Sequence, residues 1–322
     1  MKYEEVLRHL GQHQERLKVR YLYALSGMTR AQLDEFRRVW PSFSVERRRA
    51  IVRSLAELTE HSYEVNFDAI FLLALGDEDP EVRSAAIEGL WEYENPALIE
   101  PLIYLLRTDP AYTVRAAAAA ALGRFVLLGE LEKLSPALSQ RVEEVLRATI
   151  NQATEHTEVR CRAVEAIAYS GKAYVRQIIQ AAYHSDDDRM QASALFAMGR
   201  SADPYWRKWL TVELDNPNPA LRYEAARACG ELETSQAVPR LAEMAFNDPD
   251  REVQSAAVWA LACIGGREAR TALEACYASD DELLSQAAGE ALDHMDMLSD
   301  DVLIPLYDED TEEDGLDEDT EV

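Results

Sequence analysis

The sequence predicts an all-α fold, an α-solenoid with a helical cap at its N-terminal end and a disordered acidic C-terminal tail. Two observations predict it. One helical motif, most legible in residues 109–123, recurs from about residue 79 to residue 292. Apolar residues make up 48 % of the 322 residues, which is enough for a continuous core. Repeats of this kind stack along one axis, so we expect residues 61–300 to form one elongated domain between a cap (1–60) and a tail (301–322).

The motif reads apolar, Arg, x, x, Ala, x, x, small, apolar. Its small and apolar positions lie four, three and one residues apart and therefore fall on one stripe of a helix, where alanine lets a neighbouring helix approach closely. Asp-Pro pairs such as Asp79-Pro80 provide N-caps, and glycines such as Gly123 are expected to end the helices. The motif aligns with itself in seven places, and its second position reads Arg83, Arg115, Arg160, Gln191, Arg222, Gln254 and Ser285.

A second, more apolar helix is expected between successive motif helices. Each resulting hairpin cannot bury its own apolar stripe, so the hairpins must stack. The step from Arg115 to Arg160 is longer than the others, and we interpret Phe125–Pro136 as a long connection that bulges from the surface. The expected second helices are Pro96–Arg107, Ala173–His184, Pro204–Glu213, Gln236–Phe246 and Glu268–Ala278.

The N-terminal cap shows irregular helical spacing of apolar residues. Its basic cluster, Arg47 to Arg49 with Arg53, could bind phosphate. The favoured alternative is that it is solvated helix surface or pairs with the acidic body of the chain. The expected cap helices are Tyr3–Leu10, Glu15–Ser26, Thr29–Trp40 and Val45–Thr59.

Charge is distributed unevenly along the chain. The net charge is −26, yet residues 1–53 carry +6. Residues 308–321 hold ten acids and no base, which is typical of a solvated, disordered segment. Such a tail aids solubility, or it competes for a basic surface or recruits a basic partner. The acidic solenoid would repel a polyanion, so we expect no nucleic-acid partner.

Targeting and metal signals are weak. The N-terminus lacks a signal peptide and the longest apolar runs are too short to cross a bilayer, so we expect a cytoplasmic protein with no membrane partner. The four cysteines form no C-x-x-C pair and are interpreted as buried reduced thiols. Only His9 and His13 lie one helical turn apart, without the Glu of a zinc motif, and we expect neither a metal nor a cofactor.

Residues 79–90 and 221–230 resemble the HEAT-repeat family, in its short form often called phycobilisome-lyase-type HEAT-like repeats, and the resemblance covers roughly residues 70–298. It implies a curved stack whose motif helices line the concave face, with a ladder of Asp and Arg between units. Gln191, Gln254 and Ser285 depart from the Arg, so the ladder should weaken towards the C-terminal end. The ladder residues would be Asp79, Asp109, Asp215 and Asp248 with Arg83, Arg115, Arg160 and Arg222.

Related enzymes leave traces that can be sought in the sequence. Deoxyhypusine hydroxylases, which resemble this chain in repeat type, need His-Glu pairs for two irons, and no His-Glu pair occurs here. Phycobilin lyases bind a tetrapyrrole or its acceptor protein, and this alternative stays open. We therefore expect a non-catalytic scaffold for protein interactions. The alternative is an enzyme or chaperone that handles a chromophore or another cofactor.

The candidate binding residues come from positions that vary between repeats while the core columns stay fixed. Aromatic and arginine side chains at such positions have the composition of binding hot spots. The alternative is that Phe196 and Trp259 fill the seam between helices. Trp91, Tyr93, Trp206 and Trp209 are interpreted as packing residues, and residues 109–123 as bare scaffold. The candidate residues for a protein partner, basic in charge, are Phe196, Arg200, Tyr223, Arg227 and Trp259.

Overall fold

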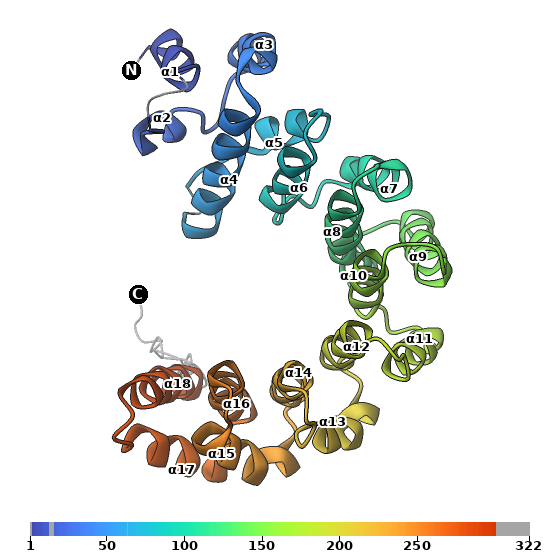
Figure 1. The fold of residues 1–322 in the computed structure, drawn as a ribbon, viewed down its shortest axis with the longest axis vertical. Coiled ribbons are helices and arrows are strands. Elements are labelled where there is room, and N and C mark those ends of the chain that lie inside the picture. The colour runs from blue at the N-terminus through green and yellow to red at the C-terminus, as the bar shows by residue number, and fades with distance from the viewer. Residues whose placement is uncertain (1, 13–15, 63, 301–322) are drawn as a thin grey trace, which may run out of the picture.

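The computed structural model describes residues 2–12, 16–62 and 64–300, and for residues 298–300 the backbone alone. Within these ranges the chain forms eighteen α-helices and short 3-10 turns, with no strand. The helices form two layers that curve into an open arc (Figure 1), with the cap at one end and α18 at the other. The predicted all-α solenoid is therefore confirmed, whereas the predicted acidic tail, residues 301–322, lies outside the described residues.

The inner layer contains the motif helices, and the outer layer contains the helices that connect them (Figure 1). The inner helices are α4 (Val45–His61), α6 (Pro80–Gly89), α8 (Tyr112–Glu130), α10 (Thr157–Ile167), α12 (Asp188–Arg200), α14 (Pro219–Glu231), α16 (Arg251–Ile264) and α18 (Glu282–Asp300). The outer helices are α5 (Asp68–Ala74), α7 (Ile99–Thr108), α9 (Pro136–Asn151), α11 (Ala173–Tyr183), α13 (Arg207–Glu213), α15 (Val238–Asn247) and α17 (Gly266–Tyr277).

The central alanine of the motif explains why the inner helices stack. It has no exposed surface in any of the seven repeats. Because alanine adds only a methyl group at this contact, neighbouring inner helices can pack closely. The larger residue beside it, such as Val82 or Leu122, is also buried and fills the remaining space. The alanines are Ala86, Ala118, Ala163, Ala194, Ala225, Ala257 and Ala288.

Gly123, Gly199 and Gly230 serve packing rather than termination, whereas Gly265 ends α16 as the glycine pattern predicts. Gly123 lies inside α8, which continues to Glu130, so the expected helix end at Gly123 is wrong. Gly230 lies within α14, where an added Cβ would meet the Cα of Ala260 on α16 at 2.9 Å. A glycine at this position therefore allows neighbouring inner helices to approach backbone to backbone.

The expected surface bulge over residues 125–136 is also wrong. Residues 125–130 extend α8, α9 begins at Pro136, and only residues 131–135 connect them. Phe125 and Val126 are buried in the core, which is why the helix continues. The extra residues of this repeat make a longer hairpin instead of a loop.

The ladder between units is present in part. Arg83 and Arg222 each make a forked pair with an aspartate of the next unit, Asp109 and Asp248, at 2.7 to 2.8 Å. The same arginines donate to carbonyls of their own turn, such as that of Asn216. Gln191 and Gln254 keep the hydrogen bond to a carbonyl of the preceding turn, Ser185 and Asp248 respectively, but make no ion pair with the next unit, as the missing guanidinium predicts.

Other ladder assignments need correction. Arg115 pairs with Glu155 rather than with an aspartate, because the longer hairpin places Glu155 at the turn. Arg160 donates its Nε to the carbonyl of Ile150. Asp79 pairs with Arg49 of α4 and Asp215 pairs with Arg240, so neither meets a motif arginine in the way the resemblance implied.

The cap is joined to the solenoid by the basic cluster. It consists of α1 (Tyr3–Leu10), α2 (Val19–Tyr23), α3 (Arg30–Val39) and α4, so α2 is shorter than expected. Arg48 and Arg49 pair with Asp77 and Asp79 at 3.0 and 2.6 Å. Arg48 and Arg49 therefore pair with the acidic body rather than forming solvated helix surface.

Helix α8 is the single described helix that is long and apolar enough to cross a membrane by length and composition alone. Half of it is buried among the neighbouring helices, as is typical of a core helix of a solenoid. Its hydropathy comes from the alanines Ala116 to Ala121 together with Val114, Leu122, Phe125, Val126, Leu127 and Leu128.

Candidate protein-binding face

The five predicted residues lie on three neighbouring inner helices, α12, α14 and α16. The guanidinium carbon of Arg227 lies 4.3 Å from the ring centre of Trp259, and that of Arg200 lies 5.1 Å from the ring centre of Phe196. The structure thus brings four of them together as two cation-π pairs. Tyr223, one turn from Arg227 on α14, is half-buried and packs against the core.

The two aromatic residues differ in their surroundings. Trp259 packs against the core, and its ring lies over Gly230, where an added Cβ would touch the ring carbon Cζ3 at 2.8 Å. Trp259 therefore fills part of the seam between α14 and α16 while keeping some exposed surface. Phe196 is half-buried as well, and the exposed Arg200 lies over its ring.

Three carboxylates that the sequence did not single out complete this patch, which we call the charged patch (Glu165, Phe196, Arg200, Tyr223, Glu224, Arg227, Glu231 and Trp259). Glu231 pairs with Arg200 at 3.3 Å. Glu165 reaches from α10 to accept a hydrogen bond from Ser193 of α12 at 2.6 Å and pairs with Arg162. The same self-alignment could have revealed them, because Glu165 shares a column with Phe196 and Arg227, and Glu231 shares a column with Arg200.

Glu224 is the most perturbed carboxyl of the patch. Burial raises its pKa to about 7, and the nearby negative charge of Glu165 adds to the effect. Burial also raises the pKa of Glu165. The patch consequently holds acidic groups that lack full compensation, beside arginines already engaged with aromatic rings.

A groove lies on the inner face of α6, α8 and α10, next to the charged patch. Its volume is about 840 Å³. Trp91 and Tyr112 stand at its sides, with 46 % and 42 % of their surfaces exposed. The floor consists of Ala116, Ala117, Ala120 and Ala121. We call this site the alanine groove.

Polar groups line the ends of the alanine groove. Arg124 donates Nη1 to the carbonyls of Leu90 and Trp91, while its Nε and Nη2 are buried without a partner among the described residues. Burial lowers the pKa of Arg124. Arg162 is paired with Glu158 at 2.8 Å on the opposite side. The groove therefore offers apolar surface bounded by charge of both signs.

The alanine groove corrects two interpretations. Trp91 is exposed rather than a packing residue, whereas Trp206 is fully buried and Tyr93 and Trp209 pack against the core as expected. Residues 109–123 are not bare scaffold, because their alanines form the floor of the groove. Sequence reasoning missed the site because it looked for large side chains at the variable positions, and here small ones create the hollow.

The histidines and cysteines that the structure describes show no grouping typical of a metal site. No cluster of three or more His, Cys, Asp or Glu side chains that could hold a metal occurs among the described residues. His9 stacks on Tyr21 at 4.1 Å and accepts a hydrogen bond from the backbone of Lys18, while His13 lies outside the described residues. Three of the four free cysteines are buried, and Cys263 is half-buried.

Comparison with solved structures agrees with the arc of helical hairpins. The complex of CpcE and CpcF of phycocyanin lyase from Nostoc is 18 % identical, with a TM-score of 0.51, and covers 89 % of this chain and 97 % of that one. Human deoxyhypusine hydroxylase is 18 % identical, with a TM-score of 0.33, and covers 92 % of this chain and 96 % of that one. At this identity the likeness to the lyase complex concerns the fold alone. No curated protein sequence matches the chain.

The sequence pattern typical of HEAT repeats matches residues 68–155 and 207–293, which together make up more than half of the chain. The matched ranges include the groove helices α6 and α8 and the patch helices α14 and α16. The stacked hairpins and the ladder of ion pairs agree with that match, and the chain belongs to the HEAT-repeat family.

Proposed function

We propose that this protein is a non-catalytic scaffold that binds a protein partner along its inner face, with the alanine groove as the main contact. The observation that supports this most directly is the exposure of Trp91 and Tyr112 over an apolar floor in a hollow of about 840 Å³. Exposed aromatic residues beside an apolar hollow are the usual composition of an interface core.

The continuity of the inner face favours a macromolecular partner. Arg162 lines the alanine groove and also pairs with Glu165 of the charged patch, so the two sites share one edge on α10. A segment of a partner protein bound along this face would contact the apolar alanine groove at one end and the aromatic and charged groups of the charged patch at the other. Since residues 54–300 carry a net charge of −21, we propose that the partner is basic, because opposite charge speeds association.

The test fills the groove without disturbing the core. Ala120 is exposed on the groove floor, so Ala120→Trp should fold normally yet occupy the space that a partner needs. We expect affinity purification from the native cell with the full chain to recover a partner, and the variant to lower its affinity at least about tenfold, equivalent to about 1.4 kcal/mol. Melting temperature and circular dichroism of both chains would check the fold.

The matched control is Ala137→Trp on the outer helix α9, where Ala137 is exposed as well. It adds the same side chain to the opposite layer and should leave the affinity unchanged. Equal binding by Ala120→Trp and the unmodified chain would contradict the groove as the contact. Equal loss in both variants would indicate a non-specific effect of surface tryptophan.

A small-molecule function is the second candidate, favoured by the size of the same groove, which lies in the range of ligand pockets. In that case the chain would handle a chromophore or another aromatic ligand, as a lyase or chaperone. Absorbance and native mass spectrometry of protein purified from its own cell decide between the two. A stoichiometric bound molecule would replace the scaffold proposal.

We further propose that the protein works in the cytoplasm. All four of its cysteines are free thiols, and three of them are buried in the core, where they pack as small apolar side chains. Such usage fits a reducing compartment, where disulfides are rare. Fractionation of the native cell followed by detection with a specific antibody would test this placement.

A further inference from the structure

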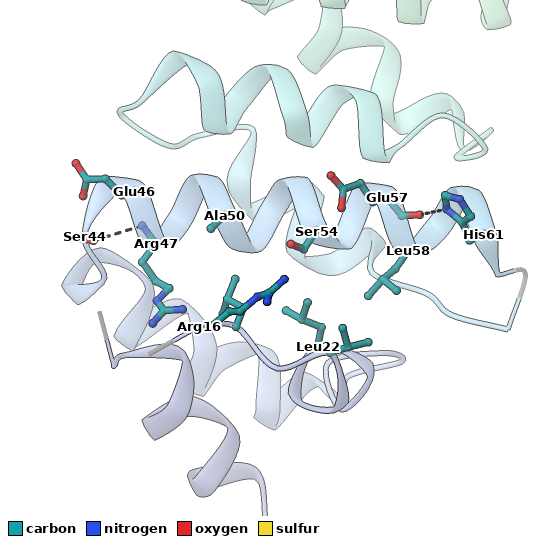
Figure 2. Close-up of a pocket in the computed structure, with 12 residues that line it drawn as sticks. Arg16, Leu22, Ser44, Glu46, Arg47, Ala50, Ser54, Glu57, Leu58 and His61 are labelled. Carbon is teal, nitrogen blue, oxygen red and sulfur yellow. Dashed lines mark hydrogen bonds between the residues drawn. The ribbon is translucent and has the colours of Figure 1, made fainter. Parts of the chain in front are cut away.

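Two hollows besides the alanine groove differ in their charge. One lies between the cap and α4 and has a volume of about 720 Å³. Figure 2 shows Arg16 and Arg47 there together with Glu46 and Glu57. Because two arginines and two glutamates line it, this hollow offers no net charge to a ligand.

The other hollow is lined by the outer helices α9 and α11 and by α10 and α12 of the inner layer. Its volume is about 480 Å³, which lies in the range of ligand pockets. Arg147 and Arg160 line it, and none of the described aspartates or glutamates does. Val164 and Met190 belong to its apolar wall and are buried. We call this hollow the arginine cavity.

Arg160 lacks the carboxylate partner that other arginines of the ladder have. Arg83 pairs with Asp109, which stands six residues before the motif position of the following helix, α8. In the unit of α12 the motif position is Gln191, and the residue six places before it is Ser185. The ladder therefore keeps its arginine at α10 but has no acid in the next turn to receive it.

Ser185 performs only one of the two tasks of a ladder aspartate. Its Oγ accepts a hydrogen bond from the backbone N–H of Asp187 at 3.2 Å. Asp109 and Asp248 accept the same bond from the residue two places on, and their carboxylates also bind the ladder arginine. A serine hydroxyl can accept the turn bond, but it carries no charge for a guanidinium.

The two arginines of the cavity have no ion pair with a described residue. Arg160 donates Nε to the carbonyl of Ile150 at 3.0 Å, while its Nη1 and Nη2 make no hydrogen bond within the described part of the chain. The guanidinium carbon of Arg147 lies 4.3 Å from the ring centre of Tyr174. The cavity therefore holds two positive charges without a counter-charge.

The acids near the cavity are engaged elsewhere or point away from its lining. Glu143 pairs with Lys172 at 2.6 Å. Asp187 pairs with Arg189 at 2.9 Å. Asp186 is exposed and does not line the cavity. The charge of the two arginines is thus available to a ligand.

We propose that the arginine cavity binds a small organic carboxylate, whose negative group pairs with Arg160 as a ladder aspartate would. A guanidinium matches a carboxylate through two parallel N–H···O bonds, and Nη1 and Nη2 of Arg160 form such a fork. Arg147 adds a second charge, and the buried apolar wall suits an apolar body beside the carboxylate. The site is independent of the proposed scaffold function, because it shares no lining residue with the alanine groove.

Benzoate is the probe, titrated calorimetrically into the full chain in a buffer without other carboxylates or phosphate. We expect benzoate to bind at least about tenfold more tightly than the neutral benzamide, which cannot form the ion pair. Inorganic phosphate should bind more weakly than benzoate, because it has no apolar body. Equal binding of benzoate and benzamide, or no binding of benzoate, would overturn the site, and tighter binding of phosphate would overturn the assignment to an organic carboxylate.

Substitution of Ser185 makes the test specific to the missing ladder acid. Ser185→Asp should raise the melting temperature and lower the affinity for benzoate at least about tenfold, because the new carboxylate pairs with Arg160. Arg160→Gln should lower the affinity to a similar extent. The matched control, Arg107→Gln, removes an exposed arginine in the last turn of the outer helix α7 and should leave benzoate binding unchanged. Unchanged affinity in Ser185→Asp, or an equal loss in the control, would contradict the proposal.

Discussion

The inner face has two halves that share a core and differ at the surface. In the groove half (α6, α8, α10) the variable position of α8 is Ala120, and the alanines beside it leave the surface hollow and apolar. In the patch half (α12, α14, α16) the equivalent positions hold Phe196, Arg227 and Trp259, and the surface is filled and charged. The buried alanine column is the same in both. A constant core therefore lets surface residues vary, and a small residue shapes the face as much as a large one.

The largest expected loss of stability comes from substitutions in the ladder of Arg–Asp pairs, which both halves of the inner face share. Arg222→Ala in the patch half leaves the buried Asp248 without its partner, which should lower the free energy of unfolding by about 3 kcal/mol. Arg83→Ala should cost about as much in the groove half, because the Arg83–Asp109 pair has the same geometry. Urea denaturation followed by circular dichroism would measure both.

Two controls separate the ladder from ordinary polar contacts. Gln254→Ala removes the hydrogen bond to the Asp248 carbonyl and an exposed one from Arg251, and should cost about 1 kcal/mol. Arg240→Ala breaks a surface pair with Asp215 and should cost less than about 0.5 kcal/mol. A loss for Arg240→Ala equal to that for Arg222→Ala would contradict burial as the cause.

The next effect is confined to the patch half and depends on pH. The pKa of Glu224 is raised from 4.5 to about 7 by burial and then by Glu165, so folding favours its protonated form. The associated stability is complete below about pH 4.5 and is lost as the pH rises through about 7. Glu224→Gln should therefore stabilise the chain by up to about 2 kcal/mol at pH 8 and leave it unchanged at pH 4.5.

Glu88→Gln provides the comparison from the groove half. Burial raises the pKa of Glu88 too, but this residue is more exposed, so its replacement should give a smaller change across the same pH range. Thermal melts of both variants at pH 4.5 and pH 8 would show the difference. Stabilisation by Glu224→Gln at pH 4.5 would contradict a role for ionisation.

The fold could be predicted from the sequence because each repeat carries the same local patterns of helix caps and apolar spacing. The spacing of Ala225 and Leu221 fixes a helix stripe, and the Asp79-Pro80 pair marks a helix start at the observed residue. The longer α8 escaped prediction, since Gly123 reads as a stop until the helix that covers it is known. Tertiary packing, through Ala166 of α10, decides that position.

The candidate site was predictable to a smaller extent. Arg227 and Trp259 lie at the same repeat position on the neighbouring helices α14 and α16, so the repeat register brings them together. Phe196 and Arg200 lie one turn apart on α12, so helix spacing alone brings them together. The alanine groove could not be predicted in the same way, because a hollow depends on the sizes of side chains on three neighbouring helices at once. Trp91 shows this, since its exposure follows from the small side chains of α8 and not from its own repeat position.

The smallest expected effect on stability distinguishes the aromatic residues of the two halves. Trp91→Ala in the groove half removes a side chain that is 46 % exposed and should change the free energy of unfolding by less than about 0.5 kcal/mol. Trp259→Ala removes a ring that lies over Gly230 in the helix seam and should cost about 1 to 2 kcal/mol. If the scaffold proposal holds, both should weaken partner binding, but only Trp91→Ala would do so in a chain of unchanged stability. An equal loss of stability in the two variants would mean that Trp91 is a packing residue after all, and the distinction between a binding groove and a packed seam would then fail.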